Sequence, residues 1–274
     1  MAETERPNAR DVHSVLAAAM ADPVLLERWR REPSSIAASG NGATAIDLTK
    51  VWRFSGLVTK VRYSDLRSNL PVTFRMLDAA GVSIELFAAY APTAAGLRNA
   101  GLNSKSAKLD AFMNFLDGWL DRTSPVHTLL WDMIRHESAI FHVQTSAAGR
   151  SDAPPGAISA GSVPVRRAGA VVHELTCNPV EAARIVRAGG DPASVPREDH
   201  KFCYCASQDG AQIQIIEIDA LAGFLLDSAD GSTTVSEIAG LLLQCGITLE
   251  PEDLVDSIGT LVTAGLLEIV DRGA

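Results

Sequence analysis

Apolar residues in the first half of the chain recur at helical spacing. One stripe runs through Leu109, Phe112, Met113, Leu116 and Trp119, the i, i+3, i+4, i+7 pattern of a half-buried helix. A second stripe covers 126–143 after Ser124-Pro125, a typical cap and first helical residue. Shorter helices are expected at 12–20, 47–58, 61–69, 71–80 and 82–90, with Gly81, Pro92, Gly96 and Gly101 as punctuation. The first half is therefore predicted to be all-helical.

The second half has a different pattern. Strands are expected at 171–177, 202–206 and 211–218, the last after the turn residues Asp209-Gly210. Helical patterns follow at 221–229, 233–245 and 251–264, and 266–270 returns extended. Thr234 precedes Glu237 by three residues, which is a capping-box arrangement. Three strands followed by three helices predict a small winged helix-turn-helix domain, so the fold class is α+β.

A segment poor in large apolar residues separates the halves. Residues 145–162 consist almost entirely of Gly, Pro, Ser, Thr and Ala, and Pro154-Pro155 blocks a helix. We therefore expect a helical partner-docking domain at 1–145, a flexible linker at 146–162 and a winged-helix peptide-recognition domain at 163–274.

Charge narrows the classes of function. The chain of 274 residues carries a net charge of −9. Residues 207–271 contain 12 acidic side chains and no lysine or arginine, so this domain would repel a DNA duplex. Nucleic-acid binding is therefore not expected. No apolar run reaches the length of a membrane span, and four cysteines are too few for a disulfide scaffold. We expect a cytoplasmic protein with reduced thiols.

The C-terminal sequence resembles that of a known family. It reads IIEIDALAGFLLDSADGSTTVSEIAGLLLQ and then EDLVDSIGTLVTAGLLEI. This resembles the small chaperone of pyrroloquinoline quinone biosynthesis and the related recognition elements, over about 60 residues. The resemblance implies that the domain binds the leader of a ribosomally made precursor peptide.

In the resembled domains, the third strand and third helix form the peptide groove, and an added peptide strand gains main-chain hydrogen bonds there. These elements correspond here to 211–218 and 252–264. An acidic lining suits a peptide that carries lysine or arginine, although the same acids also suit a plain solvated surface. The expected peptide-binding residues are Gln212, Gln214, Ile216, Asp253, Asp256, Ser257 and Thr260.

The first half carries a second resemblance. It has Asp22-Pro23-Val-Leu-Leu-Glu-Arg-Trp-Arg near its start and Ile134-Arg135-His136-Glu137 near its end, and it is joined to a recognition-element-like domain. This layout resembles the partner subunits of multinuclear non-haem iron oxidative enzymes of the methanobactin and 3-thiaglutamate pathways. The resemblance implies a heterodimer in which the enzyme holds the iron and this chain binds no cofactor. The expected contacts with the enzyme are Trp29, Arg30, His136 and Glu137.

One cluster offers metal or catalytic chemistry instead. It consists of His173, Cys177, His200, Cys203 and Cys205, which are soft or borderline ligands. No Cys-x2-Cys pair is present, and cysteine on a strand is commonly a small buried apolar residue. Cys203 and Cys205 are expected on one face of their strand. His136-Glu137 lacks the second histidine of a zinc-protease helix, since Ile140 stands in its place. No metal is expected.

These patterns favour a non-catalytic accessory subunit that holds a precursor leader and presents it to an iron-dependent oxidative enzyme. Two alternatives remain open. One is a winged-helix transcriptional or signalling regulator, and the other is a metal-binding enzyme that uses the Cys/His cluster.

Overall fold

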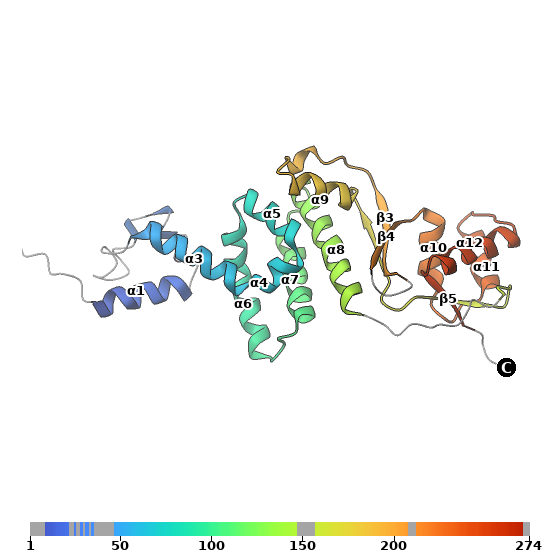
Figure 1. Ribbon diagram of the computed structural model, residues 1–274, viewed down its shortest axis with the longest axis horizontal. Helices are drawn as coiled ribbons and strands as arrows, with labels where there is room; N and C mark the ends of the chain where they lie inside the picture. Colours follow the sequence, from blue (N-terminus) through green and yellow to red (C-terminus); the bar gives the residue numbers. More distant parts are fainter. Residues whose placement is uncertain are drawn as a thin grey trace, which may run out of the picture. The chain divides into compact units, whose positions relative to one another are not determined.

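The computed structural model describes residues 9–146, 157–207 and 212–270, apart from 22–24, 26–27, 30, 33 and 36–46. It divides the chain into two compact units, residues 1–121 and 122–274 (Figure 1). The fold is mixed, with 61% of the described residues in helices and 12% in strands of small antiparallel sheets. The predicted α+β class is therefore confirmed at this level.

The described part of the first unit is helical. Its helices are α1 (Ala9–Ala21), α3 (Leu48–Arg62), α4 (Ser64–Asn69), α5 (Pro71–Ala79), α6 (Ser83–Asn99) and α7 (Lys105–Trp119). On α7, the predicted stripe buries Leu109, Phe112 and Leu116. Helix α6 continues through Pro92 and Gly96, so the predicted stop near residue 90 is wrong. A proline inside a helix loses one main-chain hydrogen bond, and here the helix persists nonetheless.

The second unit contains five α-helices, one short 3-10 helix (Pro192–Ser194) and five strands among its described residues. The α-helices and strands are α8 (Pro125–Thr145), β1 (Val163–Arg166), β2 (Val171–Leu175), α9 (Pro179–Arg187), β3 (His200–Ala206), β4 (Ile213–Glu217), α10 (Ala220–Ser228), α11 (Val235–Gln244), α12 (Pro251–Thr263) and β5 (Leu267–Val270). The predicted capping box on α11 is confirmed, since Thr234 and Glu237 exchange hydrogen bonds there. No helix in the described part of the chain has the length and apolar character needed to cross a membrane.

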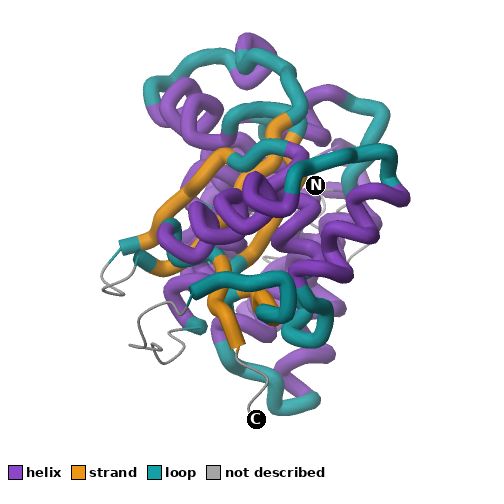
Figure 2. The backbone as a smooth tube through the Cα atoms, turned by 90° about the vertical axis from the view of Figure 1, so that its right-hand side faces the viewer, coloured by secondary structure: helices purple, strands orange, loops and turns teal. Residues whose placement is uncertain are grey.

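A three-stranded antiparallel sheet in the order β2-β3-β4 forms the middle of this unit, and β1 pairs separately with β5 (Figure 2, strands in orange). One sheet face presents Phe202 and Tyr204 to an apolar cluster that includes Ala139 and Val143 of α8. The other face buries Cys203 and Cys205 in a larger cluster with residues of α10, α11 and α12. The sheet therefore lies between α8 and the C-terminal helices.

The boundary between the units differs from the expected one. Helix α8 belongs to the second unit, whereas the sequence placed it at the end of the first. The reason is that α8 packs on the sheet through its apolar face and bonds to β2 and the residue after it through Arg135 and the buried Asp132. Residues 147–156 of the predicted linker lie outside the described residues. Its last residues are part of the folded unit, because Ser162 and Ala160 accept main-chain hydrogen bonds from Val235 and Ser236 of α11.

Candidate functional site

The outer edge of β4 is the candidate site. The sheet order β2-β3-β4 leaves β4 at an edge, and no other strand of the described residues pairs with it there. The unused main-chain groups of an edge strand are a template for pairing with another chain. Which groups point outward follows from the register and from the bonds at the two ends of the β3–β4 ladder.

Those end bonds fix the pattern. Ile218 N donates to Lys201 O at 2.8 Å, and Ser207 N donates to Gln212 O at 2.7 Å. Between them Cys203 pairs with Ile216 and Cys205 with Gln214. Residues opposite each other in an antiparallel ladder alternate between bonded and non-bonded pairs. The even-numbered residues of β4 therefore bond to β3, and the main-chain groups of Ile213, Ile215 and Glu217 point outward.

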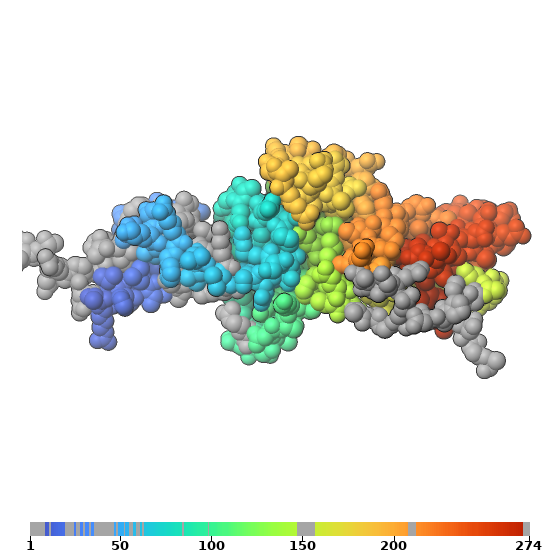
Figure 3. Space-filling view, in the orientation of Figure 1, coloured from blue at the N-terminus to red at the C-terminus, as the bar shows by residue number. Residues whose placement is uncertain are grey.

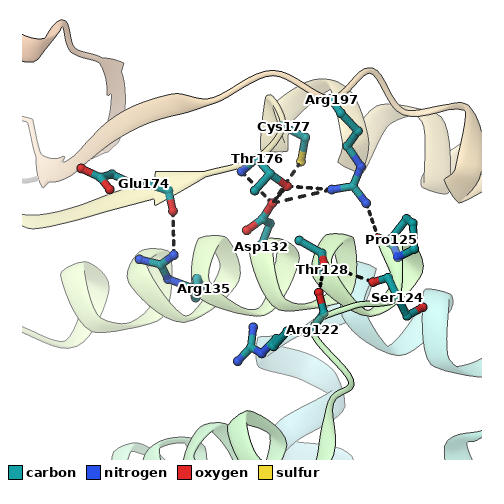
Figure 4. Close-up of polar contacts among 10 residues, drawn as sticks. All are labelled: Arg122, Ser124, Pro125, Thr128, Asp132, Arg135, Glu174, Thr176, Cys177 and Arg197. Atoms are coloured by element: carbon teal, nitrogen blue, oxygen red, sulfur yellow. Dashed lines mark hydrogen bonds and ion pairs between the residues drawn. The ribbon is translucent and has the colours of Figure 1, made fainter.

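The other edge of the sheet, on β2, is covered by α8 (Figure 4). Arg135 donates from Nη1 to the main-chain oxygen of Glu174 at 2.6 Å. Two residues further, the main-chain N–H of Thr176 donates to Asp132 Oδ2 at 2.8 Å. Asp132 and Arg135 lie one helical turn apart on α8, so one face of this helix bonds an outward group of β2 and an outward group of the residue that follows it. Strand addition is therefore blocked at this edge.

Further side chains hold Asp132 in place. The Thr176 hydroxyl donates to Asp132 Oδ2 at 2.6 Å, and Arg197 donates from Nη1 to that hydroxyl oxygen at 2.8 Å. Arg197 also bonds the main-chain oxygen of Pro125. Asp132 is only 2% exposed, and a buried carboxylate needs such partners. Burial and the adjacent Asp132 carboxylate raise the pKa of the Cys177 thiol to about 12, so this cysteine stays protonated and is no reactive nucleophile.

Two histidines are held neutral between α8 and the sheet. His136 Nδ1 and the Tyr204 hydroxyl lie 3.0 Å apart within hydrogen-bonding distance. Arg135 donates from Nη2 to His173 Nδ1 at 3.1 Å, which places the proton of His173 on Nε2. Burial, with Arg187 as a further cause, lowers the pKa of His136 to about 4. Burial and Arg135 lower the pKa of His173 to about 4 as well.

The five candidate metal ligands are not brought together. Cys203 and Cys205 do share one strand face, as predicted, but it faces the C-terminal helices. His173 pairs with Phe202 and therefore lies on the opposite face, toward α8. His200, two residues before Phe202 on β3, lies on that same face, and its Nδ1 is 2.6 Å from Glu217 Oε1. Within the described residues, no three His, Cys, Asp or Glu side chains form a group that could hold a metal ion.

The predicted peptide-binding residues divide between two places. Gln212 lies in the turn before β4, and Gln214 and Ile216 belong to the even-numbered series whose main-chain groups bond β3. The main-chain groups of Gln214 and Ile216 are therefore already used within the sheet and cannot bond an added strand. Asp253, Asp256, Ser257 and Thr260 do share one side of α12.

A groove on α12 has different walls from those expected. It has a volume of about 770 Å³ and is lined by Ile158, Val255, Asp256, Gly259, Thr260, Thr263 and Ala264. No residue of β4 lines it, and Ile158 from the segment before β1 packs against the C-terminal cluster. Asp256 and Thr260, expected to share a groove with the third strand, line this groove together with Ile158 instead.

Three of the four residues predicted to contact the enzyme are buried. Trp29 is 1% exposed, and His136 and Glu137 are 5% exposed each. Side chains this buried cannot serve as surface anchors, because they are already packed in the interior. Arg30 lies outside the described residues.

Sequence reasoning missed an exposed apolar stripe on α3. Phe54, Leu57 and Val61 are 56%, 57% and 66% exposed, and the spacing i, i+3, i+7 places them on one helix face. The helix contains four basic residues and no acidic one (Figure 3, light blue). Contiguous exposed apolar surface of this kind commonly marks a protein-protein contact. The spacing alone could have indicated it.

No protein-family model matches the chain, and the comparison with curated proteins gave no match either.

Proposed function

We propose that this protein is a non-catalytic accessory subunit that binds the leader of a ribosomally made precursor peptide. It would present that peptide to an iron-dependent oxidative enzyme, which holds the iron. Tethering the precursor beside the enzyme raises its effective concentration and so accelerates modification without any turnover by this chain.

The observation that carries the proposal is the difference between the two sheet edges. At the β2 edge, Arg135 and Asp132 bond the Glu174 oxygen and the N–H of the next outward residue, Thr176, whereas β4 presents the outward groups of Ile213, Ile215 and Glu217. A peptide that adds as a strand needs such a row of main-chain donors and acceptors. The uncovered edge therefore favours a peptide as the ligand.

The C-terminal elements support the same proposal. We interpret α10, α11 and α12 as the three helices of a winged helix, with β1 and β5 as its wing. Its acidic composition, with 12 acidic and no basic residues at 207–271, disfavours a DNA duplex and favours a basic leader. Asp253 and Asp256 on α12 would attract such a leader.

The stripe on α3 is the surface we propose for contact with the enzyme. Phe54, Leu57 and Val61 supply exposed apolar area, and the sequence of α3, with basic and no acidic residues, suits an acidic partner surface. This surface replaces the buried Trp29, His136 and Glu137 as the proposed docking site.

Co-purification tests the proposal. The tagged chain is expressed with the proteins encoded beside it, and the eluate is assayed for stoichiometry and iron. A one-to-one complex whose iron travels with the partner supports the accessory role, and the precursor leader is then titrated onto the complex. A chain that elutes alone and binds no leader contradicts it.

A further inference from the structure

The side chains at the open β4 edge define which peptide sequence fits there. Ile213, Ile215 and Glu217 pair across the sheet with Ala206, Tyr204 and Phe202. Cross-strand partners point to the same face, so all three lie on the face that packs against α8. None of the three was among the residues expected from the sequence.

These three positions are not equivalent. Ile213 and Ile215 are half-buried and extend the apolar cluster formed by Phe202, Tyr204 and α8 residues. The Glu217 side chain is 54% exposed, and its Oε1 lies 2.6 Å from Nδ1 of His200 on β3. Along the edge, the order is therefore apolar, apolar, acidic at every second residue.

Every second side chain of an added strand would lie beside one of these three β4 side chains. Because the outward main-chain groups belong to the same three residues, an antiparallel peptide forms its bonded pairs directly opposite them. Its side chains at these positions lie on the same face, about 5 Å from those of β4. The intervening side chains point to the other face, beside the exposed Gln214, where polar residues are tolerated.

We infer that the β4 edge selects a leader segment of the pattern Lys/Arg-x-apolar-x-apolar, bound antiparallel, with its basic residue opposite Glu217. Antiparallel pairing reverses the order, so the basic residue comes first in the peptide. This inference rests on the proposed peptide binding and adds its direction and sequence preference.

Three fluorescent peptides test it on the full chain by anisotropy. The first contains Lys-Ser-Val-Ser-Val, the second has the reversed order Val-Ser-Val-Ser-Lys, and the third replaces lysine by glutamate. The first is expected to bind about fivefold more tightly than either other peptide, which corresponds to one favourable cross-strand charge pair and the apolar contacts. Equal affinities for all three would overturn the inference while leaving peptide binding intact.

Charge variants assign the preference to a residue. Glu217→Gln should remove the discrimination between lysine and glutamate peptides, and Glu217→Lys should reverse it. Glu181→Lys, at an exposed position of α9, is the matched control and should leave the discrimination unchanged. A reversal produced by Glu181→Lys as well would assign the preference to overall charge rather than to Glu217 and overturn the inference. Binding of none of the peptides would contradict the proposed function itself.

Discussion

Arg135 of α8 donates a hydrogen bond to the main-chain oxygen of Glu174 at 2.6 Å. Together with the bond from Thr176 N to Asp132, it closes one edge of the central sheet. Proteins commonly cover sheet edges to prevent unwanted strand pairing. The opposite edge on β4 has no such cover among the described residues, and this asymmetry is the basis of the proposed function.

Removal of Asp132 should destabilise the second unit strongly. Asp132→Ala leaves the Thr176 N–H and hydroxyl without their acceptor in a half-buried place, which costs roughly 3 kcal/mol of unfolding free energy. Urea denaturation of the full chain measures this. Asp253→Ala, an exposed acid on α12, is the control and should change the unfolding free energy by less than about 0.5 kcal/mol. Equal effects of the two variants would show that Asp132 does not hold α8 to the sheet.

The buried histidines should make stability depend on pH. Their folded pKa values of about 4 lie below the ordinary value of 6.5, so the unfolded chain takes up protons first as the pH falls. The unfolding free energy should therefore decrease from pH 6.5 to 4 and level off below, by up to about 3 kcal/mol per histidine. Denaturation curves at several pH values measure the slope.

A variant identifies His136 as one source of this slope. His136→Gln keeps a polar partner for Tyr204 but cannot be protonated, so the dependence on pH should become shallower. His13→Gln, at an exposed position on α1, should leave the slope as it is. A slope unaffected by His136→Gln would mean that other groups cause it.

Proline placement should separate the two sides of β4. Ile215→Pro removes an outward N–H, and proline is tolerated at such edge positions, so the chain should fold and lose peptide affinity by about tenfold. Ile216→Pro removes an N–H that bonds β3 and should disrupt the sheet. Circular dichroism and anisotropy distinguish these results. Full peptide affinity in a folded Ile215→Pro variant would argue against strand addition at β4.

The α3 stripe should affect enzyme contact alone. Leu57→Asp places a charge in the exposed apolar face and should reduce the enzyme recovered in co-purification by about tenfold, while leader binding stays unchanged. Val180→Asp, at an exposed apolar residue of α9 in the other unit, is the control. Equal enzyme recovery with both variants would remove α3 from the proposed interface.

Local signals predicted much of the fold. The capping box at Thr234 and Glu237 fixed the start of α11, and the apolar stripe of α12 gave its extent within a residue. Helix α9 was missed, although Asn178 caps it and Pro179 opens it, which is a readable signal. Strand β1 had no such signal, because it is defined by pairing with β5, about a hundred residues later.

The site was harder to predict because it depends on non-local contacts. From the sequence of 211–218, either the odd-numbered or the even-numbered residues could direct their main-chain groups to the open edge. Only the bonds to β3 show that Ile213, Ile215 and Glu217 do so. The role of Asp132 and Arg135 is equally non-local, since it requires that α8 lie beside β2. Metal ligands that look close in sequence were separated by strand alternation.

Amide hydrogen exchange with and without the leader peptide tests the central claim most directly. Peptide binding at the β4 edge should slow exchange of the Ile213, Ile215 and Glu217 amides, because each gains a main-chain acceptor. The Val172 and Glu174 amides on β2 should not change. Protection that appears on β2, or only on α12, would contradict strand addition at β4.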